Sequence, residues 1–139
     1  MTSPRRAIIA SDGAFTYDDL DDASRRVAGS LLADNEDLNQ TRVAFLVRPS
    51  FAYAAVQRGI WRAGGVAVPL AVSHPPAELE YVIRDSGAAV VVGDKASEAT
   101  LMPLARAAHA RFVSADDALH ATPAEGLPHL GSNRRAMII

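Results

Sequence analysis

The feature that most constrains the fold is a regular alternation of short, β-branched apolar runs with segments of helical periodicity. The apolar runs are RVAFLV at 42–47, GVAVPL at 65–70, AAVVVG at 88–93 and a run at about 110–114. Each has the length of a buried strand. Strands that alternate with helices through short connections predict a parallel sheet wound with right-handed crossovers. We therefore expect an α/β fold with three layers, α/β/α, and a mainly parallel sheet.

The segment before the first of these strands predicts a hairpin followed by a helix. Asp12-Gly13 lies between two β-prone pieces, which is a hairpin signal. Thr16 stands three residues before Asp19, the spacing of a capping box at a helix start. The helix that follows places apolar residues three or four apart, on one face, at Leu20, Ala23, Val27 and Leu31.

Three further helices are expected between and after the strands. Pro49-Ser50 is a turn and helix cap, and the helix from about 51 to 63 ends at Gly64-Gly65. Pro75-Pro76 suits the first turn of the next helix, which buries Leu79, Val82 and Ile83 and ends at Gly87. A helix over 100–108 tolerates Pro103 only in its first turn. Residues 123–133 are expected to be a loop, and RRAMII at 134–139 resembles the start of another buried strand.

Composition excludes several classes of protein. The formal net charge of -2 gives no basic field for nucleic acid or an anionic membrane, so neither partner is expected. The chain has no cysteine, which excludes disulfides, a thiol nucleophile and thiolate metal sites. No stretch approaches the roughly 20 apolar residues of a membrane span, and the apolar run after Arg6 is too short for a signal peptide. We expect a cytoplasmic protein.

No local motif assigns a catalytic, cofactor-binding or metal-binding residue. The four histidines lack paired-ligand spacing; they are His74, His109, His120 and His129. The aspartates at 18, 19, 21 and 22 lack the pattern of a calcium loop and coincide with a helix start, which favours capping. Gly64-Gly65 lacks the spacing of a phosphate loop, and no serine has the setting of a nucleophile. The site prediction is therefore none.

Taken in order, three segments resemble the N-terminal region of the adenylate-forming superfamily, which includes acyl-CoA synthetases, adenylation domains and luciferases. The segments are FTYDDL, RVAFLVRPSFAYAAVQRGIWRAGGVAVPL and HPPAELEYVIRDSGAAVVVG. Nine residues stand where the family pattern has them: Arg42, Gly64, Gly65, Pro69, Pro75, Glu78, Leu79, Asp85 and Ser86. The resemblance covers roughly residues 12–139 and is strongest to malonyl-CoA and methylmalonyl-CoA synthetases.

The resemblance implies the N-terminal part of an ATP-dependent acyl-CoA synthetase. RRAMII resembles the strand before the family's phosphate loop, so residues 1–139 would be a partial N-terminal subdomain truncated before that loop. A synthetase of this family makes an acyl-adenylate from a carboxylate and ATP with magnesium, and then a thioester with CoA. The motifs for these steps lie beyond Ile139, so the chain alone is expected to be inactive and to bind no cofactor.

Two other interpretations remain open from the sequence. The chain could be a free-standing, non-catalytic α/β module that binds a nucleotide, CoA or a protein. Alternatively, the rest of a parent chain normally covers its sheet edge and helix faces, and the isolated piece associates with itself. The expected partner is the remainder of the parent chain, with self-association as a further expectation.

Overall fold

The computed structural model describes residues 6–10 and 13–128, with side chains from residue 13 onward. Four parallel strands form its main sheet in the order β4-β3-β5-β6. They are β3 (Arg42–Leu46), β4 (Val66–Pro69), β5 (Val90–Gly93) and β6 (Arg111–Ser114). The four apolar runs of the sequence all become strands of this sheet, as predicted.

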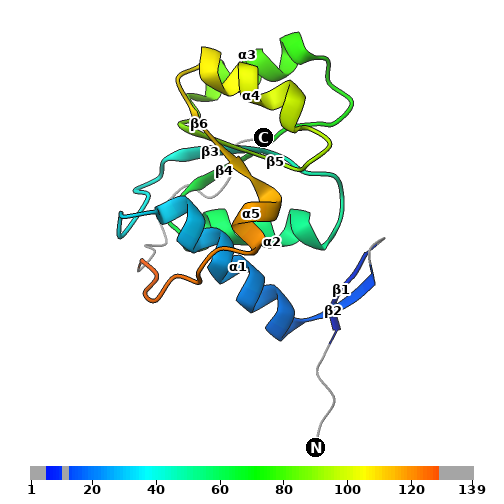
Figure 1. Cartoon of the computed structure of the whole chain (residues 1–139), viewed down its shortest axis with the longest axis vertical. Coiled ribbons are helices and arrows are strands. Elements are labelled where there is room, and N and C mark those ends of the chain that lie inside the picture. Colours follow the sequence, from blue (N-terminus) through cyan, green and yellow to red (C-terminus); the bar gives the residue numbers. More distant parts are fainter. Residues whose placement is uncertain (1–5, 11–12, 129–139) are drawn as a thin grey trace, which may run out of the picture.

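Helices cover both faces of the sheet and give three layers (Figure 1). One face carries α1 (Tyr17–Leu32), α2 (Phe51–Arg62) and α5 (Ala115–Leu119). The other carries α3 (Pro76–Ser86) and α4 (Glu98–Ala107). Side chains alternate between the two faces along a strand. In β3, Val43 and Phe45 face the first layer, and Ala44 and Leu46 face the second. The three-layer α/β/α prediction is confirmed.

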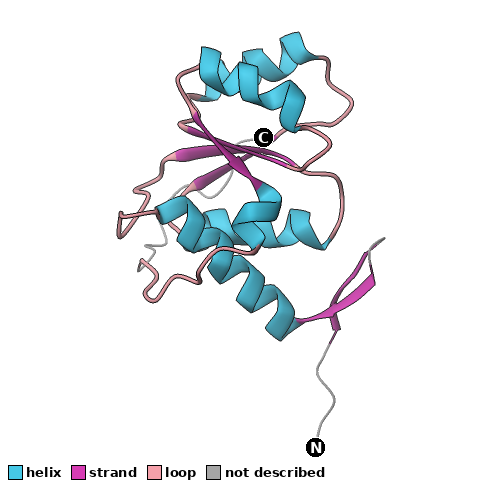
Figure 2. Cartoon of the chain, in the orientation of Figure 1, coloured by secondary structure: helices cyan, strands magenta, loops and turns pink. Residues whose placement is uncertain are grey.

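The N-terminal hairpin is a separate two-stranded sheet (Figure 2). It pairs β1 (Arg6–Ala10) with β2 (Gly13–Thr16) in antiparallel fashion. Gly13 has φ +130°, a backbone conformation that other residues rarely adopt. Beyond this turn, Phe15 stacks on Phe51 with ring centroids 4.1 Å apart, which joins the hairpin to α2. The predicted hairpin is therefore present, although Asp12 lies outside the described residues.

Local sequence signals set the helix ends. Thr16 and Asp19 form the expected capping box, each side chain accepting the other residue's backbone N–H. The Ser50 hydroxyl accepts the Tyr53 amide at the start of α2. After α2 the Gly64 and Gly65 amides donate to the carbonyls of Trp61 and Ile60, the Schellman pattern that ends a helix. The capping and helix-ending interpretations of these residues are confirmed.

Two details of the predicted helices are wrong. Helix α4 begins at Glu98 rather than Thr100, so Pro103 lies in its second turn. Proline there removes the hydrogen bond to the Ala99 carbonyl and brings its ring against that carbonyl, so Pro103 is unfavourable for α4. Helix α5 was not expected, because five residues are too few to show helical periodicity. The strand predicted at 134–139 and the last part of the loop predicted at 123–133 lie outside the described residues.

Candidate functional site

The carboxyl edge of the parallel sheet is the first place where the fold could bind a ligand. After β3 the chain turns to α2 on one face, whereas after β4 and β5 it turns to α3 and α4 on the other. The loops therefore diverge on either side of β3. In open α/β sheets, ligands bind in the crevice that such a divergence opens beyond the strand ends.

Asp94 and Arg48 meet at this divergence. Asp94 directly follows β5, and its Oδ2 accepts the Arg48 backbone N–H at 3.0 Å. Its Oδ1 accepts the Ser97 amide at 2.9 Å. The Arg48 Nε also lies 3.6 Å from Oδ2, with the Asp94 side chain 17% exposed and that of Arg48 67% exposed. The carboxylate is thus committed to ordering the two loops, while most of the guanidinium faces solvent.

The surroundings of Asp94 favour its charged form. Partial burial by itself raises the pKa of the carboxyl group. Hydrogen bonds from the Arg48 amide and from the hydroxyl and amide of Ser97, with the Arg48 charge, outweigh this and leave the pKa lowered from its ordinary value of 3.8. Asp94 is therefore a structural carboxylate at neutral pH and is poorly suited to accept a proton as a general base.

A small hollow lies beside this pair at the same edge. It has a volume of about 230 Å³ and is lined in part by Val72, Ala96 and Ser97. Val72 is a large apolar residue that is 55% exposed. His74 lines the hollow as well, with its Nε2 3.7 Å from Glu78 Oε2. The edge thus combines an exposed cation, an imidazole and apolar surface.

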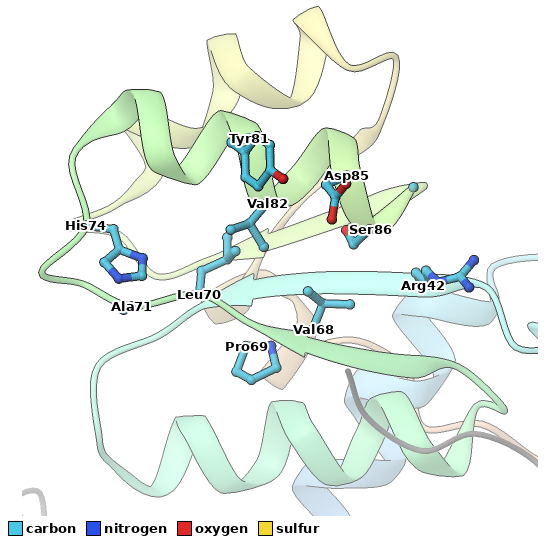
Figure 3. A pocket seen from close by; sticks show the side chains of 11 residues that line it. Arg42, Val68, Pro69, Leu70, Ala71, His74, Tyr81, Val82, Asp85 and Ser86 are labelled. Carbon is cyan, nitrogen blue, oxygen red and sulfur yellow. The ribbon is translucent and has the colours of Figure 1, made fainter. Parts of the chain in front are cut away.

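A larger groove runs between α3 and β4 (Figure 3). Its volume is about 650 Å³, within the range of ligand pockets in proteins. Its lining residues are Arg42, Val68, Pro69, Leu70, Ala71, His74, Tyr81, Val82, Asp85, Ser86 and Gly87.

The groove has an apolar middle and polar ends. Figure 3 shows Val68, Leu70 and Val82 in its centre, Arg42 with Asp85 and Ser86 toward one end, and His74 at the other. The Ser86 hydroxyl already donates to the Ile83 carbonyl at 3.2 Å. Val68 is 2% exposed and Leu70 is 8% exposed.

Two features of the groove are unusual among the described residues. Tyr81 on its rim is 68% exposed, the largest value among the exposed large hydrophobic residues described. The Arg42 Nε is buried without a hydrogen-bond partner among the described residues, which is an unfavourable state for a polar atom.

The described residues do not bring together the metal-site candidates that the sequence offered. No group of three or more His, Asp or Glu side chains among them could hold a metal ion. His74, which precedes α3, lies 3.7 Å from Glu78 of that helix, and His120, the C-cap of α5, lies 3.8 Å from Asp116. His129 lies outside the described residues. Asp18 and Asp19 lie in the first turn of α1, as the capping interpretation requires. The prediction that this chain carries no catalytic residue stays a prediction.

Comparison with known proteins places the chain in a family. Residues 1–133 match the family described as AMP-binding enzyme. The chain belongs to the AMP-binding enzyme family. One relative is the mitochondrial malonate–CoA ligase ACSF3 of Xenopus laevis, which is 38% identical over 109 residues. The match covers 76% of this chain and 19% of that ligase. The Homo sapiens ligase of the same name is 34% identical over 145 aligned positions, covering 97% of this chain and 25% of its own length.

Solved structures agree with the sequence matches. ATP-bound MatB from Rhodopseudomonas palustris superposes with a TM-score of 0.85 at 26% identity, covering all of this chain and 30% of MatB. The predicted likeness to the N-terminal part of the adenylate-forming fold is confirmed. The chain spans about a fifth to a quarter of the length of the curated relatives it matches.

The structure gathers some of the family-pattern residues and separates others. Arg42, Pro69, Asp85 and Ser86 all line the groove. Gly64 and Gly65 instead end α2, and Leu79 is buried under α3 in the core. Reasoning from the sequence missed Arg48 and Asp94, since no motif marks them. The available signal was that both follow predicted strands, whose carboxyl ends share one edge of a parallel sheet.

Within the described residues, no helix is both long and apolar enough to cross a membrane.

Proposed function

We propose that this chain is the N-terminal part of an AMP-forming acyl-CoA ligase whose substrate is a malonate-type dicarboxylate. The observation that carries the proposal is the match of almost the whole chain to malonate–CoA ligases. The alignment with the human enzyme has 34% identity and covers 97% of this chain. The superposition on ATP-bound MatB supports the same group.

The proposed reaction has two steps. A carboxylate oxygen of the substrate attacks the α-phosphate of ATP, and pyrophosphate leaves with the electrons of the broken phosphoanhydride bond. The CoA thiol then attacks the acyl carbon, AMP leaves, and the thiol proton passes to solvent or a base. Magnesium stabilises the charge that develops on the phosphate oxygens.

The chain's own share in this reaction is structural. We assign magnesium, ATP and CoA to the longer parent enzyme, because the family motifs for these steps lie beyond Ile139. What the chain supplies is a rigid parallel sheet whose carboxyl edge is ordered by Asp94 and Arg48. We propose that residues 1–139 alone are inactive.

The proposed partner is the remainder of the parent ligase. The groove between α3 and β4 supports this proposal, because Tyr81 is exposed on its rim and the Arg42 Nε has no hydrogen-bond partner within the part of the chain that the structure describes. We keep the cytoplasm as the proposed location of the parent enzyme, although two relatives are named as mitochondrial.

The test combines the intact mass of the protein made from its native gene with ATP–pyrophosphate exchange. The acids compared are malonate, methylmalonate and a long-chain fatty acid. We expect a mass well above 14.7 kDa and exchange that depends on malonate or methylmalonate. Exchange with the fatty acid alone would refute the dicarboxylate assignment. A native mass of 14.7 kDa without exchange would refute the ligase proposal.

The groove also favours a second candidate, a non-catalytic binding module. Its volume of about 650 Å³ suits a small ligand or a peptide segment. Under this alternative the native protein has the mass of the present chain, and Tyr81→Ala weakens ligand binding without affecting folding. Calorimetric titration with ATP and with CoA separates this candidate from the ligase fragment, for which we expect no binding.

A further inference from the structure

The chain that leaves α5 turns back and runs along α1 (Figure 1). Backbone and side chain both hold it there. The Ala124 amide donates to the Arg25 carbonyl at 3.1 Å, and the Arg25 Nη2 donates to the Ala124 carbonyl at 3.2 Å. One turn of helix is thereby joined to one residue of the returning chain by two opposed hydrogen bonds.

A second arginine of α1 holds the start of the same segment. The Arg26 Nη1 donates to the Ala121 carbonyl at 3.1 Å, and its Nε pairs with Asp22 Oδ2 at 2.9 Å. Because Asp22 fixes the guanidinium, the bond to Ala121 needs little further ordering of the side chain. Hydrogen bonds from charged donors are stronger than neutral ones.

Gly29 makes this close approach possible. A Cβ atom added at Gly29 would lie 2.4 Å from the Thr122 carbonyl oxygen and 3.0 Å from the Ala124 nitrogen. Both are backbone atoms, so a larger residue could not be accommodated by rotating a side chain. Gly126, in the same segment, has nothing within 4 Å of such an atom. The glycine at position 29 is therefore required by contact with the returning chain.

Apolar packing adds to these contacts. Ala124 and Leu127 pack against the core cluster that contains Val27 and Leu31 of α1. The Arg25 Nε is buried without a hydrogen-bond partner among the described residues. Because this atom is cut off from water in a partly buried side chain, the bonds from the Arg25 terminal nitrogens to the returning chain matter more.

We propose that residues 121–125 form a strap, clamped on α1 by Arg25, Arg26 and Gly29, whose role is to position the chain that continues toward the phosphate loop. This role rests on the proposed function. Each residue of chain reaches at most about 3.3–3.6 Å. Anchoring at Ala124 therefore limits the positions that the following residues can reach, and lowers the conformational entropy that their ordering in the parent ligase costs.

The absence of cysteine allows a direct test on this chain. Glu125→Cys on the strap and Arg58→Cys on α2 are both exposed sites for spin labels. We expect a narrow distribution of distances between the two labels in the doubly labelled chain without further changes and in the control Gly126→Ala. We expect a broadened distribution in Gly29→Ala. Hydrogen exchange at the Ala124 amide should lose protection only in Gly29→Ala, while Val92 in β5 stays protected. An unchanged distribution with Ala124 still protected overturns the strap.

If the Val92 amide also loses protection in Gly29→Ala, the whole fold has been disturbed. Arg25→Met then gives the same test, because it removes the bond to Ala124 without adding bulk at the contact. The positioning role is tested in the ligase expressed from its native gene. We expect Gly29→Ala to lower kcat for pyrophosphate exchange by about ten- to a hundredfold with little change in KM for ATP, and Gly126→Ala to have no effect. If kcat is unchanged in Gly29→Ala although the distance distribution shows that the strap has left α1, the positioning role is overturned. Absence of exchange in the unmutated protein refutes the ligase proposal, while the distance measurement still decides whether the strap exists.

Discussion

Arg62 at the end of α2 reaches across to Asp21 on α1, with its Nη1 2.8 Å from Asp21 Oδ1. The same Nη1 lies 2.8 Å from the hydroxyl of Ser24. Ser24 is the one polar residue in the buried set described, with 0% exposure. One guanidinium group therefore both pairs with a surface carboxylate and satisfies a hydroxyl in the α1–α2 interface.

Removing that guanidinium should destabilise the fold more than removing the carboxylate. We expect Arg62→Met to lower the free energy of unfolding by about 1–2 kcal/mol, because a charged donor to a buried hydroxyl is lost. Asp21→Asn should lower it by less than about 0.5 kcal/mol, since the Asp21 side chain is 58% exposed and exposed ion pairs contribute little. Urea denaturation of both variants measures the difference. Equal effects would show that the ion pair, and not Ser24, is the important contact.

Gly59 should be needed where α2 crosses α1. A Cβ atom there would lie 2.5 Å from Val27 Cγ1 and 3.0 Å from the Ser24 carbonyl oxygen. We expect Gly59→Ala to destabilise the protein by about 1–3 kcal/mol through overpacking. Adding Val27→Ala should recover only a small part of this loss, because it removes Val27 Cγ1 but leaves Val27 Cβ, which would lie 2.6 Å from the added atom. Thermal unfolding of the two single variants and the double variant tests the coupling, and strict additivity would contradict it.

Asp94 should make stability depend on pH in acid. Its pKa is lowered in the folded state, so its stabilising effect is complete above the ordinary carboxyl pKa and is lost as the pH falls through the folded value. We expect Asp94→Asn to be less stable than the unmutated chain at pH 7. The difference in their free energies of unfolding should narrow as the pH falls below about 4. Denaturation midpoints from pH 7 down to pH 3 measure this. A gap that stays constant would show that Asp94 does not titrate differently on folding.

The groove beside α3 should make the isolated chain associate with itself. Tyr81 is 68% exposed on its rim, whereas Met102 on α4 is 40% exposed and does not line it. We expect the apparent mass of the unmutated 139-residue chain to increase with concentration in sedimentation equilibrium. Tyr81→Lys should abolish this increase by placing a charge on the apolar contact. Met102→Lys is the control and should associate like the unmutated chain. An unmutated chain that stays monomeric contradicts the proposed self-association.

The sequence predicted those features that depend on residues close together in the chain. The capping box joins Thr16 and Asp19 across three positions, and the ends of α2 and α3 lie at glycines that adopt positive φ. The same kind of signal was available for α5, where the Ser114 hydroxyl accepts the Asp117 amide. It was overlooked because so short a helix shows no periodicity. Pro103 was misplaced by one turn because helix boundaries are the least certain part of such predictions.

The residues of the candidate site could not be found in this way. Arg48 and Asp94 are 46 positions apart, and Arg25 and Ala124 are 99 positions apart. Nothing in the local sequence around either pair marks the contact. They meet because β5 lies beside β3 in the sheet and because the chain after α5 returns along α1.

The sequence by itself therefore determined the succession of the strands and the longer helices, most of their ends, the α/β class and the family resemblance. These depend on hydrogen bonds within a few residues and on the period of apolar side chains. Only the tertiary structure decided the strand order β4-β3-β5-β6, the groove between α3 and β4, and the contact of Gly29 with the strap. These depend on which surfaces pack together, and many local sequences are compatible with the same packing.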